Sequence, residues 1–264
     1  MTEVNTMTQR CSRIAIVTGA TRRKGIGAAI CRALAQEGTD IFFTHWHPYD
    51  QQMAWGITEE EPLALERELR QAGIRAESLS IDLSDPAAPA RVLDEAEKRL
   101  GTPAILVNNA AYSLRDIHFD KLTAEILDAH YAVNMRATLL LSSLFAQRCP
   151  TGCDGRIIAM TSGQSLGPMP GELAYIATKG AIEAFIRTLA VEVASKGITV
   201  NAVNPGPTDT GWMDEVIKKE LLPRFPMGRE GRPEDAARLI AFLARKEAGW
   251  ITGQVIHSEG GFIR

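Results

Sequence analysis

The stretch RIAIVTGATRRKGIGAAICR, residues 13–32, decides the fold of this chain. It begins with a short apolar run from Ile14 to Val17, which is typical of a strand buried on both faces. Gly19, Gly25 and Gly27 follow, at the start of a segment with helical periodicity. A strand that leads through a glycine-rich turn into a helix lets backbone N–H groups and the positive helix end face a pyrophosphate. The stretch therefore predicts a dinucleotide-binding unit.

Apolar runs of strand length recur along the chain, separated by amphipathic segments with the spacing of helices. The expected strands are residues 14–17, 40–44, 78–82, 105–109, 156–162, 199–205 and 254–258. This alternation predicts an α/β protein with a single-domain, Rossmann-type, doubly wound parallel sheet of about seven strands and helices on both faces. We assign residues 13–264 to one dinucleotide-binding and catalytic domain, and residues 1–12 to a flexible N-terminal tail.

The composition limits the partners and the compartment. The chain has 29 Lys plus Arg against 32 Asp plus Glu, a formal charge of −3, so no basic field attracts nucleic acid or anionic lipid. The polar start of the chain lacks a secretory signal, and no stretch has the roughly 18 apolar residues of a membrane span. We expect a cytoplasmic protein with small-molecule partners. The four cysteines predict free thiols, and the spacing of Cys149 and Cys153 does not fit a metal site, so we expect none.

One helical segment carries a candidate proton-transfer pair. Tyr175 and Lys179 stand at positions i and i+4, which share one face of a helix. A neighbouring ammonium favours the phenolate, so we expect the pKa of Tyr175 to fall toward neutral pH. Ser162 follows an expected strand and could bond a substrate carbonyl at the same edge. From these residues alone, a packed tyrosine, a solvated lysine and a turn serine remain the alternative.

An ordered series of motifs resembles the short-chain dehydrogenase/reductase family over roughly residues 13–262. The turn TGATRRKGIG is similar to that family's TGxxxGxG turn, lengthened by two residues. Tyr175 and Lys179 match its YxxxK pattern, and Ser162 stands thirteen residues before the tyrosine. The remaining motifs are NNAA (108–111), Asn134 in YAVNM, NPGPTDT (204–210) and the closing ITGQVIHSEGG. The overall pattern resembles 3-oxoacyl-[acyl-carrier-protein] reductase-like members.

The resemblance implies an enzyme that transfers a hydride between a nicotinamide and a ketone or secondary alcohol, with reduction of a 3-oxoacyl thioester as one candidate reaction. It assigns the catalytic roles to Asn134, Ser162, Tyr175 and Lys179: the tyrosine exchanges the proton, the lysine also binds the nicotinamide ribose, and the asparagine holds a water. It assigns cofactor contacts to Gly19, Thr21, Arg22, Arg23, Gly25, Ile26, Gly27, His45, Asp82, Leu83, Asn109, Ala110, Tyr175, Lys179, Pro205, Gly206, Thr208 and Thr210. It also implies a homotetramer or homodimer, paired through helices at 123–147 and 175–195.

The end of the second expected strand, DIFFTHW, indicates which dinucleotide binds. NAD-selecting members of the family carry an aspartate where this chain has His45, so no carboxylate repels a 2′-phosphate there. Arg22 and Arg23 lie in the glycine turn, where NADP-using members often carry a basic residue. We therefore predict that NADP(H) is preferred and that NAD(H) remains possible, because Asp50 could reach the ribose if its loop folds back.

Three other functions compete with carbonyl reduction. A nucleophilic-serine hydrolase is disfavoured because Ser162 lies in TSGQS and not in a GxSxG elbow. An enoyl-carrier-protein reductase-like enzyme would place its lysine at position 182, which is isoleucine here. A catalytically silent scaffold that binds dinucleotides is the third alternative.

The substrate walls are expected at residues 112–118, 163–173 and 206–226, the last as a lid. No charged residue among them identifies a substrate. The unusual segment 46–62 either specialises the adenine end or covers the sheet edge.

Overall fold

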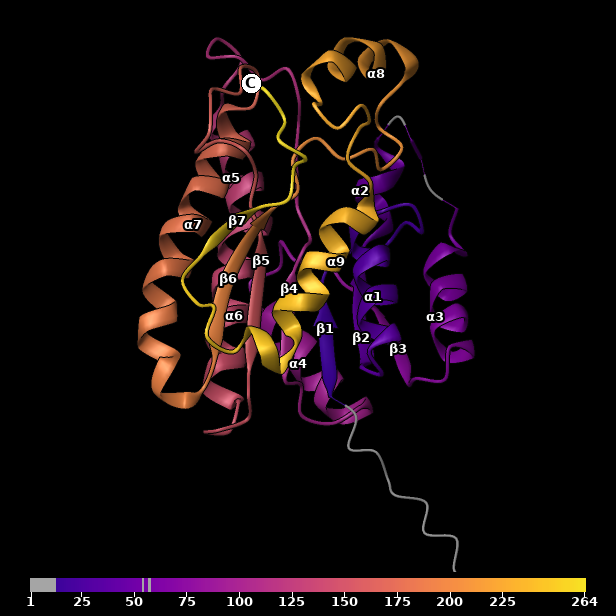
Figure 1. The fold of residues 1–264 in the computed structure, drawn as a ribbon, viewed down its shortest axis with the longest axis vertical. Helices are drawn as coiled ribbons and strands as arrows, with labels where there is room; N and C mark the ends of the chain where they lie inside the picture. Colours follow the sequence, from indigo (N-terminus) through magenta and orange to yellow (C-terminus); the bar gives the residue numbers. More distant parts are fainter. Residues whose placement is uncertain (1–12, 54, 57) are drawn as a thin grey trace, which may run out of the picture.

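The computed structural model describes residues 13–53, 55–56 and 58–264, so the predicted tail, residues 1–12, lies outside them. A seven-stranded parallel sheet with the order β3-β2-β1-β4-β5-β6-β7 forms its centre (Figure 1). The strands are β1 Ile14–Val17, β2 Asp40–His45, β3 Ala76–Ser80, β4 Ile105–Asn108, β5 Arg156–Met160, β6 Thr199–Asn204 and β7 Val255–His257. The predicted Rossmann-type sheet is confirmed.

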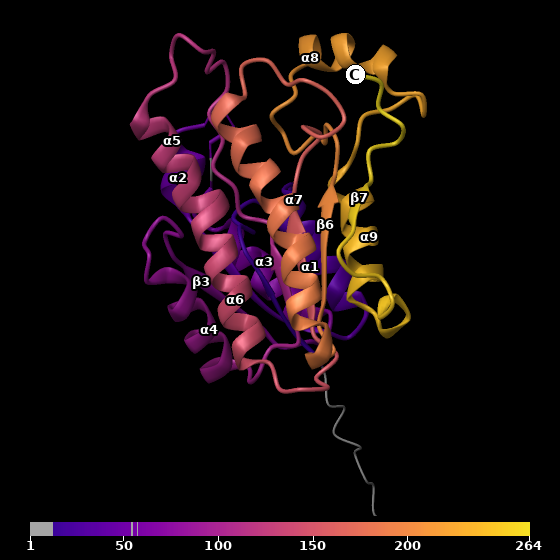
Figure 2. The ribbon, with the colours of Figure 1, turned by 90° about the vertical axis from the view of Figure 1, so that its left-hand side faces the viewer.

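Helices cover both faces of the sheet. The α-helices are α1 Ile26–Gln36, α2 His47–Gln51, α3 Glu61–Gln71, α4 Ala88–Arg99, α5 Ala124–His130, α6 Thr138–Arg148, α7 Leu173–Val193, α8 Glu215–Leu221 and α9 Pro233–Ala244. A π-helix, η1 Tyr131–Ala137, joins α5 to α6, and short 3₁₀ turns occupy η2 Ala194–Lys196, η3 Leu222–Arg224 and η4 Lys246–Ala248. Helices α1, α3 and α9 lie on one side and α4, α6 and α7 on the other (Figure 2).

The central strands are apolar on both faces because helices cover both. In β1, Ile16 packs into the core layer beneath α4, α6 and α7, while Ala15 and Val17 pack into the layer beneath α1 and α9. Phe42 and Phe43 of β2 divide in the same way. This double burial explains why these strands appear in the sequence as continuous apolar runs rather than as alternating patterns.

The strand order reverses between β1 and β4. The chain builds β1, β2 and β3 outward in one direction and then returns to place β4 on the opposite side of β1. The connections that leave β1 and β4 therefore diverge and open a crevice at the carboxyl edge of the sheet, where ligands of such folds bind. Helix α8 and the end of the chain lie over this edge, at the top of Figure 1.

The prediction of free thiols is wrong for two cysteines. Cys149 and Cys153 form a disulfide. Helix α6 ends just before Cys149, and residues 150–153 then turn back toward β5, which brings the two Cα atoms to 6.4 Å. The three-residue gap that does not suit a metal pair suits a bridge across this turn. Cys31 is buried and free.

Among the described residues, no helix has the length and apolar character needed to cross a membrane.

Candidate active site

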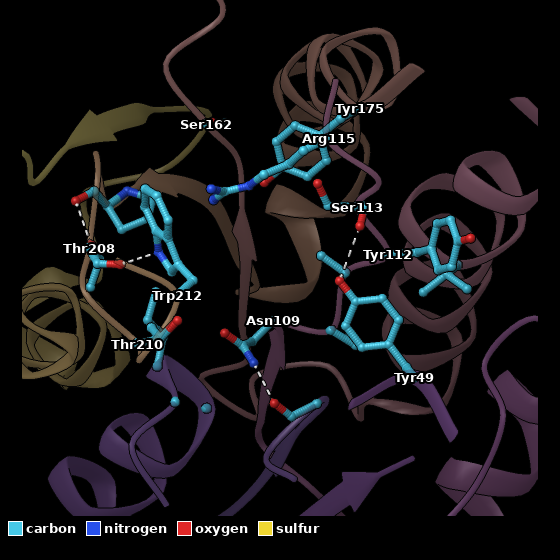
Figure 3. Close-up of a pocket in the computed structure, with 18 of the residues that line it drawn as sticks. Tyr49, Asn109, Tyr112, Ser113, Arg115, Ser162, Tyr175, Thr208, Thr210 and Trp212 are labelled. Carbon is cyan, nitrogen blue, oxygen red and sulfur yellow. Dashed lines mark hydrogen bonds between the residues drawn. The ribbon is translucent and has the colours of Figure 1, made fainter. Parts of the chain in front are cut away.

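A cavity of about 840 Å³ lies at the carboxyl edge of the sheet, above β1 and β4 (Figure 3). Its volume is within the range of small-molecule and cofactor pockets. The predicted site residues on its wall are Gly19, Thr21, Arg22, Gly25, Ile26, Gly27, His45, Asp82, Leu83, Asn109, Ala110, Ser162, Tyr175, Pro205, Gly206, Thr208 and Thr210. Arg23, Asn134 and Lys179 do not line it. The structure thus brings most of the predicted residues together in one place.

Close backbone packing explains two glycines of the turn after β1. Gly19 has φ +72°, and a Cβ there would lie 2.6 Å from Ala110 Cα. A Cβ on Gly27 would lie 2.5 Å from the Gly19 carbonyl oxygen. The Asn109 amide holds the turn from the other side, donating to the carbonyl oxygens of Thr18 (2.8 Å) and Gly19 (2.9 Å). The turn is therefore fixed against β4 and presents bare backbone to the cavity.

Arg22 is bound on three sides by residues of the cavity wall. Its Nε lies 3.0 Å from Asp50 Oδ1, and its Nη1 donates to the Thr210 carbonyl oxygen at 2.7 Å. The guanidinium carbon lies 4.5 Å from the centroid of the Trp55 ring, and the Trp55 indole donates to the same Asp50 oxygen at 2.9 Å. Arg22 therefore links the glycine turn, the segment 46–62 and residues 206–226, the segment expected to form a lid. That segment is part of the cavity wall and does more than cover the sheet edge.

Arg23 points away from the cavity. Its guanidinium pairs with Glu68 of α3 at 3.0 Å, and its backbone N–H donates to Glu61 at 2.6 Å. At the end of β2, His45 lines the cavity, and burial together with the neighbouring His47 lowers the pKa of His45 to about 4. His45 is therefore neutral at pH 7. Its Nδ1 is buried without a hydrogen-bond partner among the described residues.

Tyr175 and Lys179 lie in the first turns of α7; Lys179 is buried, and Tyr175 is partly buried on the wall of the cavity. The Lys179 ammonium lies 5.4 Å from the centre of the Tyr175 ring and donates to the Met160 carbonyl oxygen at 2.9 Å. Burial lowers the pKa of Lys179 to about 8. Burial also raises the pKa of Tyr175, and the Glu172 carboxylate adds to the rise, while a hydrogen bond with Ser162 opposes it.

The expectation that the pKa of Tyr175 falls is therefore wrong for this structure. Desolvation of the phenolate, with the Glu172 carboxylate adding to it, exceeds the opposing effects of the Ser162 hydrogen bond and the Arg115 charge. Tyr175 keeps its proton at neutral pH, which suits a group that donates a proton to a substrate.

Asn134 lies in the π-helix η1 and is fully buried. Its Oδ1 accepts from the backbone N–H of Tyr112 at 2.6 Å, and its Nδ2 donates to the Tyr112 carbonyl oxygen at 2.9 Å and to Thr178 Oγ1 at 3.1 Å. The side chain thus connects the loop after β4 to α7, close to Tyr175. π-Helical turns are frequent at functional sites. The water-holding role of Asn134 stays a prediction.

Several residues of the substrate end were not singled out from the sequence. Arg115 reaches into the cavity beside Tyr175, and its guanidinium carbon lies 3.8 Å from the centroid of the Trp212 ring (Figure 3). Glu172 also lines the cavity, and burial raises its pKa. Arg264 folds back over the loop that carries Ser162 and pairs with Glu259 at 2.6 Å. Arg115 and Glu172 lie within or beside the expected walls, but no motif distinguishes them.

The cavity and its residues can be compared with known proteins. Residues 19–263 match a family model described as enoyl-(acyl carrier protein) reductase. An uncharacterized oxidoreductase of Bacillus subtilis, YjdA, is 55% identical over 98% of this chain and 100% of that protein.

Two solved structures are also similar. A blue fluorescent protein from a metagenomic library, in complex with NADPH, is 33% identical with a TM-score of 0.84, covering 96% of this chain and 98% of that chain. A short chain dehydrogenase of Burkholderia cenocepacia, in complex with NADP, is 31% identical with a TM-score of 0.84, covering 95% and 97%.

Proposed function

The chain belongs to the short-chain dehydrogenase/reductase family of NAD(P)-dependent oxidoreductases, and on this premise we propose that it transfers a hydride between NADP(H) and a ketone or secondary alcohol. One observation carries the proposal. Tyr175 and Ser162 lie on the wall of the cavity that also contains the glycine turn, with Lys179 directly behind the tyrosine. A proton donor, a hydroxyl for the carbonyl and a dinucleotide cradle are thereby adjacent.

The residues present fit a dinucleotide. The turn from Gly19 to Gly27 lines the cavity at the start of α1, whose first N–H groups receive no side-chain cap from the described residues, so a pyrophosphate would find backbone donors there. The carboxylate of Asp82 and the side chain of Leu83 line the adenine end that the family resemblance implies. Lys179 donates to Met160 and does not itself line the cavity, so its contact with the nicotinamide ribose stays a prediction of the family resemblance. The nicotinamide, when bound, supplies or accepts the hydride.

The chain's own groups would handle the proton and the carbonyl. Ser162 would donate a hydrogen bond to the carbonyl oxygen and hold it near Tyr175. Tyr175, whose pKa is raised, would give its proton to that oxygen as the carbon is reduced. The Lys179 ammonium, with a pKa of about 8, is mainly charged at pH 7 and would stabilise the tyrosinate that remains. This arrangement favours reduction of a carbonyl at neutral pH.

The preference for NADP(H) rests on two observations. His45 stands where a carboxylate would repel a 2′-phosphate, and the Arg22 guanidinium lies in the cavity wall. Relatives of similar fold that bind NADPH and NADP support the same choice. Because Arg23 faces Glu68, the proposed clamp on the phosphate is reduced to Arg22 alone. The proposal also includes possible use of NAD(H), assembly as a homotetramer or homodimer, and a cytoplasmic location.

Carbonyl reduction is preferred to enoyl reduction, although the matching family model takes its description from the latter. Ile182, at the position where an enoyl reductase-like enzyme would carry its lysine, is buried in the apolar core. Lys179, one turn earlier, is the cation beside the tyrosine. A 3-oxoacyl thioester is one candidate substrate within this class.

Replacement of the tyrosine hydroxyl tests the proposal. Tyr175→Phe should lower kcat for ketone reduction by at least about 100-fold, because the general acid is removed. Binding of NADPH, followed by its fluorescence, should change little. Tyr131→Phe, on the exposed side of η1 and outside the cavity, is the matched control. If folded Tyr175→Phe reduces ketones at the rate of the parent, Tyr175 is not the proton donor.

A further inference from the structure

The arginines at the substrate end of the cavity differ in how many hydrogen bonds and ion pairs they form. Arg264 has its counter-ion in Glu259, at 3.0 Å and 2.6 Å. Arg224 donates to the Ile263 carbonyl oxygen at 2.7 Å and stacks on Phe262. Arg115 has no comparable bond among the described residues. Of these three arginines, Arg115 is therefore the one best placed to bind a charged group of the substrate.

Arg115 is held by stacking and not by hydrogen bonds. Its guanidinium carbon lies 3.8 Å from the centroid of the Trp212 ring, and the Trp212 indole is fixed by a 2.7 Å hydrogen bond to the Thr208 carbonyl oxygen. Stacking occupies a face of the guanidinium and leaves the N–H groups at its edge free. Figure 3 shows the side chain passing beside the Tyr175 ring toward Trp212. The donors thus lie in the wall of the cavity that also holds Tyr175, near enough for the Arg115 charge to act on the phenol.

The carboxylate nearest to Arg115 does not neutralise it well. Glu172 Oε1 lies 4.0 Å from the Arg115 Nε, the outer limit of an ion pair, and 48% of the Arg115 side chain is exposed. Burial raises the pKa of Glu172, and its Oε2 is buried without a hydrogen-bond partner. Arginine in contrast stays charged at every physiological pH. An anion that brings two oxygens to the guanidinium edge would form shorter, bidentate bonds.

We propose that Arg115 binds a carboxylate of the substrate, so that the enzyme reduces an oxo acid, or oxidises the matching hydroxy acid, in preference to a neutral ketone. This inference rests on the proposed function of the same cavity. In the reduction, the carbonyl carbon gains a hydride from NADPH, which is oxidised to NADP⁺. The oxygen gains the Tyr175 proton, and the carboxylate of the substrate is unchanged. Arg115 is thereby the residue that selects the substrate by charge.

The test compares acids with their neutral esters. Acetoacetate and 4-oxopentanoate are each measured against the methyl ester, with NADPH, in the parent and in R115Q, R115K and E172Q. In the parent, kcat/KM should be at least about tenfold higher for one of the acids than for its ester, the size of one charge-assisted hydrogen bond. R115Q should remove this preference and R115K should keep part of it. E172Q should increase it, because a competing carboxylate is lost.

Two controls distinguish direct binding of the substrate carboxylate by Arg115 from a purely structural role of this residue. Arg67→Gln removes the same charge from the exposed surface of α3, outside the cavity, and should leave the acid-to-ester ratio unchanged. Because Arg115 is half exposed, the preference should also shrink as ionic strength rises. If R115Q lowers the rates for acid and ester by the same factor, Arg115 only holds Trp212 and the lid in place, and the proposal is overturned. An ester preferred in both pairs by the parent overturns it too.

A binding measurement separates this inference from the proposed function. Calorimetric titration of the NADPH complex of Tyr175→Phe with both acids should show saturable binding of at least one, which R115Q in the same background weakens at least about tenfold. If binding depends on Arg115 but the parent enzyme reduces no ketone, the carboxylate site is supported and the proposed reaction is rejected. If the parent reduces neutral ketones but no acid binds in a way that depends on Arg115, the proposed reaction is supported and the carboxylate site is rejected.

Discussion

The ion pair between Arg22 and Asp50 leads to a prediction about cofactor preference: its removal should favour NADPH. The two side chains are 16% and 8% exposed, and their atoms lie 3.0 Å apart, so the pair is poorly screened by solvent. If Arg22 reads the 2′-phosphate of NADPH, Asp50 competes with that phosphate for the same guanidinium. Asp50→Asn should therefore improve NADPH binding relative to NADH, although it removes a native ion pair.

The expected magnitudes follow from the same contacts. Unit charges about 4 Å apart interact by about 1 kcal/mol in water and by about 4 kcal/mol near a protein surface. Taking the lower figure, loss of the Asp50 charge should raise the NADPH-to-NADH affinity ratio about fivefold. Arg22→Ala should lower that ratio by at least about tenfold, since one charge-assisted bond contributes about 1.5–3 kcal/mol. Asparagine keeps the oxygen that accepts from Trp55 at 2.9 Å, so the local fold should survive.

The assay is a fluorescence titration of each variant with NADPH and with NADH. Arg23→Ala is the matched control, because this neighbouring cation pairs with Glu68 and does not line the cavity. It should change both affinities by less than about twofold, the scale of an exposed ion pair. An Arg22→Ala variant that loses both cofactors equally would show that Arg22 only braces Thr210 and the lid. A lower NADPH-to-NADH ratio in Asp50→Asn would contradict the reasoning directly.

Two further predictions concern proton linkage and the disulfide. The pKa of Lys179, about 8 in the folded protein against an ordinary 10.5, means that the folded state releases this proton first as pH rises. Stability should therefore increase between about pH 8 and pH 10, by at most about 1.4 kcal/mol per pH unit, and denaturant unfolding of Lys179→Met should lack this increase. A parallel pH dependence in both proteins would contradict the buried-lysine account. For the Cys149–Cys153 bridge, peptide mapping should find neither of these two cysteines modified by a thiol reagent in non-reducing denaturant, and both modified after reduction; modification of both before reduction would exclude the bridge.

The fold could be predicted from the sequence because its determinants are local. An apolar run, a glycine turn and a helical repeat each fix their own backbone conformation within a few residues. The expected strand at residues 40–44 is observed at Asp40–His45. The strand expected at 78–82 is observed at Ala76–Ser80, because Ala76 and Glu77 also pair with β2 although they do not form an apolar run. Backbone pairing here extends a strand where the side-chain pattern gives no signal.

The electrostatics of the site could not be predicted in the same way, because the sequence gives neighbours but not burial. The spacing of Tyr175 and Lys179 correctly places a cation beside the phenol, at 5.4 Å from the ring centre. It does not reveal that Lys179 is buried and Tyr175 partly buried, and desolvation moves both pKa values toward the neutral forms. The direction of the shift at Tyr175 therefore depends on the packing of the whole rim and not on the motif.

Arg22 and Arg23 show the same limit most directly, because they are adjacent in the sequence and have opposite environments. One faces the cavity and donates to the carbonyl of Thr210, 188 positions away, while the other turns outward to Glu68, 45 positions away. Nothing within the glycine turn distinguishes them, since each orientation is decided by a partner that the chain supplies much later. A cation in such a turn therefore predicts a phosphate contact only when its counter-ion is known. For Arg22 that counter-ion is Asp50, so the affinity for the 2′-phosphate depends on residue 50 as much as on residue 22.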